Sequence, residues 1–91
     1  MPQSLHPLGS AIKKQREKLG LSQEKLAERC GFDRTYISML ERGRRNPSLL
    51  NLLKLAEGLE TSVSVLTEVY NGTRTNQSRA RSANTSRNSR A

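Results

Sequence analysis

Residues 21–47 read LSQEKLAERCGFDRTYISMLERGRRNP, and this stretch decides the fold. Ser22 and Asp33 each precede a short run with helical apolar spacing, which is the position of a helix N-cap. Gly31 lies between the two runs and leaves a connection of about three or four residues. A turn this short makes two helices cross steeply, which is typical of a helix-turn-helix. The two predicted helices cover about residues 23–29 and 34–42.

Caps and spacing predict three more helices around this pair. Upstream, apolar residues recur at about helical spacing from Leu8 to Leu19, and Gly20 supplies a C-terminal stop. Downstream, Ser48 and Ser62 are N-cap residues for a leucine-rich segment and a short last segment. No segment shows the sustained alternation that is typical of a strand. The predicted fold class is therefore all-α with five short helices, the other three over about residues 8–19, 49–59 and 63–70.

Composition limits the function classes. The chain has 91 residues, 16 basic against 8 acidic, a net charge of +8 and a hydrophobic fraction of 33%. No run approaches the roughly 18–20 apolar residues of a transmembrane helix, and the start of the chain lacks the pattern of a signal peptide. The single cysteine, Cys30, has no disulfide partner within the chain, and we expect a buried, inert thiol. A cytoplasmic protein with a polyanionic partner, nucleic acid first, is expected.

The positive charge is concentrated at the C-terminus. Residues 1–70 hold 11 basic and 8 acidic residues, whereas residues 71–91 hold five arginines and no acid. The latter segment has no Leu, Ile, Val, Met or Phe, so it buries too little to offset the entropy of ordering. The sequence therefore predicts a folded domain over residues 1–70 and a basic, disordered tail over residues 71–91. The tail is expected to add sequence-independent attraction to DNA.

Five motifs carry a resemblance to a known family. They are LSQEKLA at 21–27, YIS at 36–38, ERG at 41–43, RNP at 45–47 and LLKLA at 52–56. Together they resemble the lambda-repressor-like Cro/XRE helix-turn-helix regulators over about residues 8–70. The resemblance implies a five-helix DNA-binding domain in which the second and third helices form the helix-turn-helix.

The segment DRTYIS at 33–38, followed by ERGRRNP at 41–47, narrows the resemblance. It is similar to the small controller proteins of restriction–modification systems, which bind DNA as dimers. Phage repressors, plasmid regulators and some antitoxins share much of this pattern. The basic tail lies outside it.

The resemblance implies that the third helix lies in the major groove with its N-terminal residues facing base edges. Arg34, Thr35 and Ser38 are the exposed candidates for base contacts. Arg34 has the geometry for a bidentate contact to guanine, worth about 1–3 kcal/mol of discrimination. The alternative is that Arg34 contacts only phosphate.

A second group is expected to contact the DNA backbone. The residues are Gln23, Tyr36, Arg44, Arg45 and Asn46. Gln23 starts a helix, where free N–H groups favour phosphate, and the family's glutamine also braces the recognition helix. The loop residues have no apolar partner, so they should lie beside the DNA backbone. Tyr36 is read as half core and half phosphate donor. The alternatives for the others are an ordinary helix former at Gln23 and a solvated basic loop.

Two further sets are assigned structural roles. The resemblance implies that Arg16 and Glu41 form an ion pair inside the domain. Of the leucines at 49–59, five are expected to face inward and Leu50 to face another side. Leu50, Val63 and Val65 exceed what a narrow core needs and are predicted to form a two-fold dimer interface; the alternative is a broader core.

The predicted function is a transcriptional regulator that binds double-stranded DNA as a homodimer on an inverted repeat. The alternative is an antitoxin, or a phage or plasmid repressor, whose main role is to bind a protein partner. RNA polymerase or a toxin are the candidate protein partners. We expect no enzyme activity, cofactor, metal or small-molecule ligand, because no catalytic constellation or metal-ligand cluster occurs and His6 stands alone. RNA binding is a weaker option, because three aromatic residues form no stacking platform.

Overall fold

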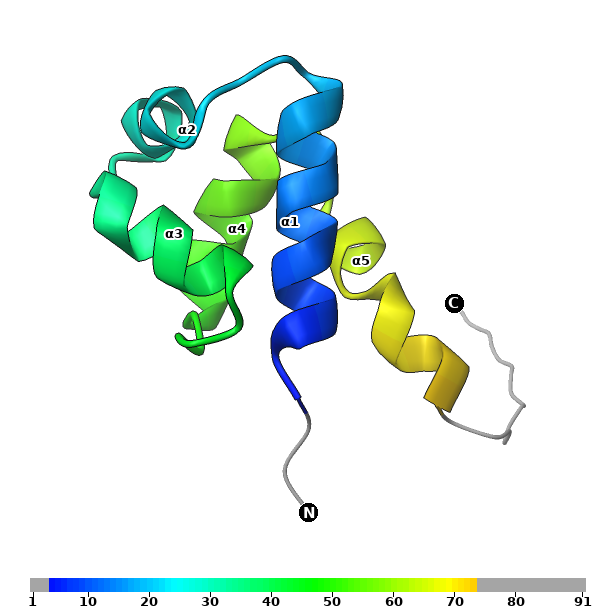
Figure 1. The fold of residues 1–91 in the computed structure, drawn as a ribbon. Coiled ribbons are helices and arrows are strands. Elements are labelled where there is room, and N and C mark those ends of the chain that lie inside the picture. The colour runs from blue at the N-terminus through cyan, green and yellow to red at the C-terminus, as the bar shows by residue number, and fades with distance from the viewer. Residues whose placement is uncertain (1–3, 74–91) are drawn as a thin grey trace.

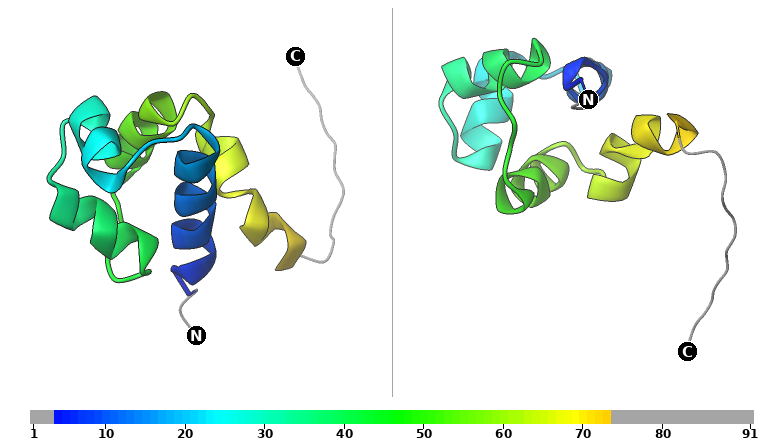
Figure 2. Two further views of the ribbon diagram at one scale, coloured as in Figure 1. Left: turned by 45° about the horizontal axis from the view of Figure 1, so that its top comes forward. Right: turned by 90° about the horizontal axis from the view of Figure 1, so that it is seen from below.

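The computed structural model describes residues 4–73, and this part of the chain is all-helical (Figure 1). The helix-turn-helix pair lies on one side of α1, and the last two elements lie on the other (Figures 1 and 2). In chain order the elements are α1 (His6–Lys18), α2 (Gln23–Cys30), α3 (Arg34–Glu41), α4 (Leu49–Gly58), α5 (Val63–Leu66) and the 3-10 helix η1 (Glu68–Thr73). The predicted all-α, five-helix class is confirmed.

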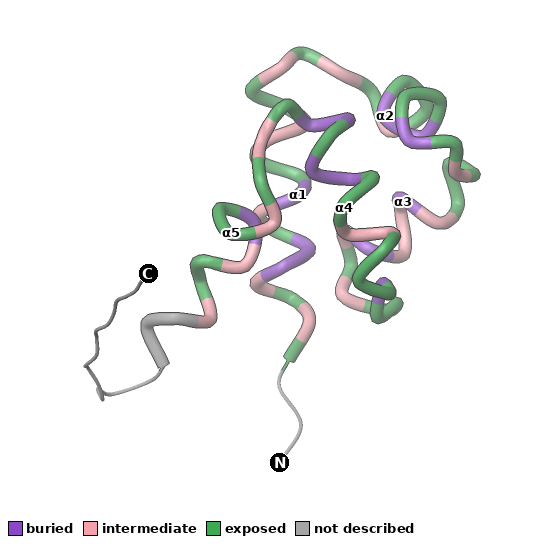
Figure 3. The backbone as a smooth tube through the Cα atoms, turned by 180° about the vertical axis from the view of Figure 1, so that it is seen from behind, coloured by how far each residue is buried: buried purple, intermediate pink, exposed green. Residues whose placement is uncertain are grey.

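The core is small and aliphatic, and every α-helix contributes to it. Figure 3 shows the buried positions on the inward faces of the helices. The largest fully buried side chains are Ile12, Leu26, Ile37, Leu40, Leu55, Leu59 and Leu66. Apolar burial of this kind supplies most of the favourable free energy of folding, and here it fixes α3 against α1 and α2.

Two glycines set the geometry of the helix-turn-helix. Gly31 has φ +77°, a left-handed conformation that favours glycine, and it ends α2 three residues before α3 begins. Gly9 lets α1 cross the end of α3 closely, because a Cβ there would lie 2.5 Å from the carbonyl oxygens of Leu40 and Glu41. The sequence placed the turn at Gly31 correctly and gave no role to Gly9.

Helix starts agree better with the prediction than helix ends do. The Oγ atoms of Ser22, Ser48 and Ser62 accept the expected capping hydrogen bonds. Asp33 occupies the N-cap position of α3, yet its side chain makes no capping bond. The last helix was predicted to run to residue 70, which is wrong: α5 ends at Leu66 and the chain continues as η1.

The inward assignment of the α4 leucines is also partly wrong. Leu55 and Leu59 are buried and Leu52 is half-buried. Leu49 and Leu53 were expected to face inward, but they are 67% and 52% exposed. More apolar surface is therefore uncovered on α4 than the sequence indicated.

No helix in the described part of the chain is long and apolar enough to cross a membrane.

Candidate nucleic-acid interface

A chain of polar contacts links the start of α3 to α1. Arg34 Nη1 donates to Gln23 Oε1 at 3.0 Å, and Gln23 Nε2 donates to Glu41 Oε1 at 3.0 Å. Arg16 binds the same carboxylate from the other side, with Nε at 2.6 Å from Oε2 and Nη2 at 3.2 Å from Oε1. Arg16 Nη1 also donates to the Leu21 carbonyl oxygen at 2.7 Å. These bonds tie both helices of the helix-turn-helix to α1.

The structure brings Arg16 and Glu41 together as the resemblance implies. Their side chains are only 11% and 4% exposed, so this is a shielded pair whose two-point geometry compensates for lost hydration. The hydrogen bond to Glu41 raises the pKa of Arg16 above its ordinary value, although burial opposes the shift. Arg16 stays charged, and its two bonds to the Glu41 carboxylate place Oε1 where it also accepts from Gln23 Nε2.

The predicted base-contacting residues lie within the first five residues of α3. Arg34 and Thr35 are exposed, and Ser38 is half-buried one turn further on. The fully buried Ile37 and Leu40 take the opposite, inward side of the helix. Arg34 offers more donors than its single contact to Gln23 uses, so its guanidinium is oriented and still able to bind a ligand.

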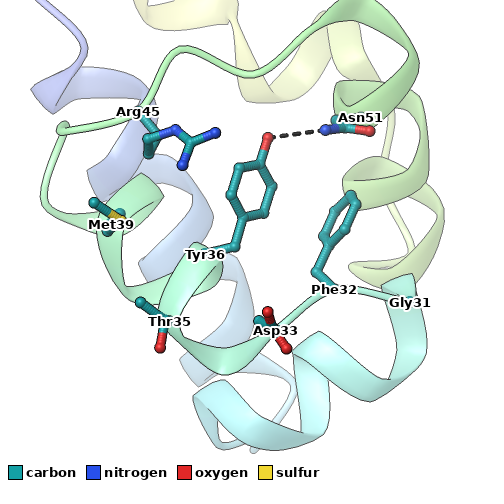
Figure 4. A pocket seen from close by; sticks show the side chains of 8 residues that line it. All are labelled: Gly31, Phe32, Asp33, Thr35, Tyr36, Met39, Arg45 and Asn51. Atoms are coloured by element: carbon teal, nitrogen blue, oxygen red, sulfur yellow. Dashed lines mark hydrogen bonds between the residues drawn. The ribbon is translucent and has the colours of Figure 1, made fainter.

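Tyr36 lies at the centre of a second polar cluster, shown in Figure 4. Its ring meets Phe32 edge to face at 4.8 Å between centroids, and the Arg45 guanidinium carbon lies 5.1 Å from its centroid. Asn51 Nδ2, from α4, donates to the Tyr36 hydroxyl oxygen at 2.9 Å. An open cavity of about 370 Å³ lies against these residues. Tyr36 is half-buried, with its ring packed against Phe32, and its contact with phosphate stays a prediction.

The basic loop after α3 has a fixed base and an exposed tip. Gly43 packs against His6, and Pro47 is buried. Between them Arg44, Arg45 and Asn46 are exposed. Of these three residues, Arg45 lies over the Tyr36 ring.

The residues predicted for a dimer interface are separate from these clusters. Leu50 and Val65 are 61% and 53% exposed, whereas Val63 is half-buried and packs on the core. Other exposed apolar residues accompany them. We call the full group the apolar set; it consists of Leu49, Leu50, Leu53, Val65 and Val69.

Sequence reasoning missed Asn51 and three members of the apolar set. Asn51 gave no signal because its partner Tyr36 lies on another helix. Leu49 and Leu53 were missed because a leucine-rich helix gives a broad apolar pattern that does not show which side is covered. Val69 was missed because it lies where the predicted last helix gives way to η1. The predicted tail lies almost wholly outside the described residues.

A helix-turn-helix pair with an exposed, polar first half of α3 defines a DNA-binding protein class. The helix-turn-helix family HTH_3 matches residues 12–66, and the chain belongs to this Cro/XRE-type family. It is a DNA-binding transcriptional regulator and not an enzyme.

The comparisons also identify individual relatives. The chain is 46% identical over 55 residues to the HTH-type transcriptional regulator y4dJ of Sinorhizobium fredii, covering 60% of this chain and 71% of that protein. It is 49% identical over 59 residues to control protein C.MunI of a Mycoplasma species, covering 64% and 80%. Among solved structures, the restriction–modification controller protein C.AhdI from Aeromonas hydrophila is similar with a TM-score of 0.67 and 45% identity, covering 68% and 94%.

Proposed function

We propose that this protein is a restriction–modification controller that binds an inverted-repeat operator as a homodimer. The observation that carries the proposal is the oriented Arg34, exposed on α3 and held through Gln23 by the Arg16–Glu41 pair. The likeness to C.MunI and C.AhdI supports the controller assignment.

In the proposed complex, α3 enters the major groove with Arg34, Thr35 and Ser38 toward base edges. Gln23 and Tyr36 flank this helix, and Arg44, Arg45 and Asn46 follow it, so we assign these five residues to the phosphate backbone. Phosphate contacts fix the register on the duplex, and base contacts supply the sequence preference.

The homodimer is proposed to form through Leu50, Val63 and Val65. Leu50 and Val65 are exposed apolar side chains, and an apolar surface of this kind is typical of a subunit interface. Val63 is expected to support the interface from below, since it packs on the core. A two-fold dimer places the α3 helices in successive major grooves, so the half-sites should be about 34 Å, or one helical turn, apart.

A protein that regulates transcription must lie in the compartment that holds the DNA. We propose a cytoplasmic location in a bacterium, with the gene on a chromosome, phage or plasmid. The arginines of residues 71–91 are proposed to add sequence-independent affinity. RNA polymerase is the proposed protein partner of an activating controller; a toxin partner would belong to the alternative antitoxin function.

The test is selection of bound fragments from randomised duplex DNA at physiological ionic strength, followed by sequencing. A two-fold symmetric consensus is expected. Binding without enrichment, lost as salt rises, would show that the charge supplies only nonspecific attraction.

A gene-neighbourhood survey tests the controller assignment separately. A restriction endonuclease or methyltransferase gene beside this one is expected. A small toxin gene in that place, with co-purification of its product, would favour the antitoxin instead.

A further inference from the structure

We propose that Asn51 is a positioning residue for DNA binding: it orients the Tyr36 hydroxyl so that its proton is donated to a backbone phosphate. The inference rests on the proposed function. It adds a residue on α4, outside the helix-turn-helix, to the DNA-binding machinery.

The direction of one hydrogen bond carries the inference. Asn51 Nδ2 donates to the Tyr36 hydroxyl oxygen at 2.9 Å, so the hydroxyl acts as an acceptor toward α4. A phenol has one proton to donate, and among the described residues that proton meets no acceptor. The hydroxyl is therefore left as an oriented donor.

The Tyr36 ring is fixed on two sides. Phe32 packs edge to face against it at 4.8 Å, and the Arg45 guanidinium lies over it at 5.1 Å. Arg45 thereby becomes a second donor held beside the hydroxyl, with five N–H groups suited to phosphate. Fixing donors before binding lowers the entropy that association costs.

The charge around the cavity favours an anion at one end. In Figure 4 the Arg45 guanidinium and the Tyr36 hydroxyl lie toward the same end of the cavity, and Asp33 lies toward the other. The cavity opens beside exposed Thr35, a predicted base contact. A duplex with α3 in its major groove has its phosphates at the groove edges, where this pair of donors would meet them.

Asn51 is suited to a test because its side chain and backbone have separate roles. The backbone N–H donates to the Ser48 cap at 3.1 Å, so Asn51→Ala removes the contact to Tyr36 and keeps the cap. Tyr36→Phe removes the hydroxyl and keeps the ring. Both changes are neutral and should leave the number of released counterions unchanged.

The experiment is a double-mutant cycle on the operator duplex, measured at several salt concentrations. Tyr36→Phe is expected to weaken binding about 3- to 10-fold, as for loss of one hydrogen bond. Asn51→Ala should weaken it by a similar or smaller factor, and should have no further effect in the Tyr36→Phe background. Neither change should alter the salt slope, whereas Arg45→Ala should reduce it by about one for each contacting protomer.

An undiminished effect of Asn51→Ala in the Tyr36→Phe background would overturn the proposal, because Asn51 would then act by another route. Equal unfolding free energies must accompany the comparison. If Asn51→Ala is poorly folded, Asn51→Asp keeps the shape but can only accept a hydrogen bond from Tyr36. Its affinity is expected at or below that of Tyr36→Phe; wild-type affinity would contradict the proposal.

Failure of the proposed function gives a different result. In that case the wild-type protein selects no operator and Arg34→Ala has no effect on binding. Failure of the inference leaves a wild-type protein that binds its operator normally and an Asn51 that is uncoupled from Tyr36.

Discussion

The polar network and the apolar set of this molecule are built in opposite ways. The side that we propose to face DNA is polar, and its central residues are hydrogen-bonded to one another from Arg34 through Gln23 and Glu41 to Arg16. The apolar set on α4, α5 and η1 consists of side chains 46–67% exposed. A polar network can be completed within one chain, whereas exposed aliphatic groups gain free energy only when another surface covers them. We therefore expect the proposed DNA-reading geometry to exist in the monomer, and the second copy of the proposed homodimer to supply the spacing of the half-sites.

The largest effect is expected from breaking the polar network at its base. Arg16→Ala leaves the 4%-exposed Glu41 carboxylate without its cation, and removal of one partner of a buried pair costs about 3–5 kcal/mol. That is a large share of the stability of a domain this small. Urea unfolding measures the change.

The matched control for Arg16→Ala is the exposed pair Lys25–Glu28, whose side chains are 66% and 67% exposed. Lys25→Ala should cost no more than about 0.5 kcal/mol. Equal costs for the two substitutions would show that the network does not hold the DNA-facing side together.

The second-largest effect is expected from substitutions in the apolar set, which should weaken the dimer and leave the monomer folded. Leu50→Glu or Val65→Glu would bury two carboxylates in a two-fold interface, one from each protomer. With about 1.5–3 kcal/mol for each buried aliphatic side chain, the dimer dissociation constant should rise at least about 100-fold. Sedimentation equilibrium measures the constant, and urea unfolding checks the monomer.

Glu28→Gln, an exposed change on α2, is the control for the interface variants and should leave the dimer intact. An unchanged dissociation constant in both Leu50→Glu and Val65→Glu would remove these residues from the interface. Dimer dissociation should also convert operator binding from one two-fold event into weak half-site binding.

The polar network and the apolar set differ as well in how much of each the sequence allowed us to predict. The starts of α2, α4 and α5 follow from local serine caps. The position of Glu41 beside Arg16 came from the family resemblance, because residues 25 apart in sequence share no local pattern.

Features that depend on tertiary packing escaped prediction. The last helix changes to 3-10 geometry before Tyr70, whose hydroxyl accepts from Leu8 N and donates to the Ser4 carbonyl. This contact joins opposite ends of the domain. The exposure of Leu53 and the contact of Asn51 with Tyr36 likewise depend on how α3 and α4 cross.

The third effect concerns sequence discrimination on the polar side. Arg34→Ala should reduce the preference for operator over a duplex with one changed base pair by about 1–3 kcal/mol. Arg34→Lys keeps the charge and loses the bidentate geometry, so it should lose most of the preference and retain most of the nonspecific affinity. Competition binding with matched duplexes measures both. Equal weakening on all duplexes would make Arg34 a phosphate contact.

The smallest effect is expected at Cys30 of α2, which packs against α4. A Cβ on Gly58 would lie 2.6 Å from its Sγ, so the contact is close. Burial raises the pKa of the Cys30 thiol above its ordinary value. The unfolded chain therefore loses this proton first as pH rises, and the folded state becomes less stable above about pH 8.5.

The difference in unfolding free energy between wild type and Cys30→Ala should shrink across that range, because only the wild type has the titrating thiol. Measured at pH 7, the difference gives the packing cost alone. A constant difference up to pH 10 would mean that the thiol reaches water in the folded state, and that the contact between α2 and α4 opens readily.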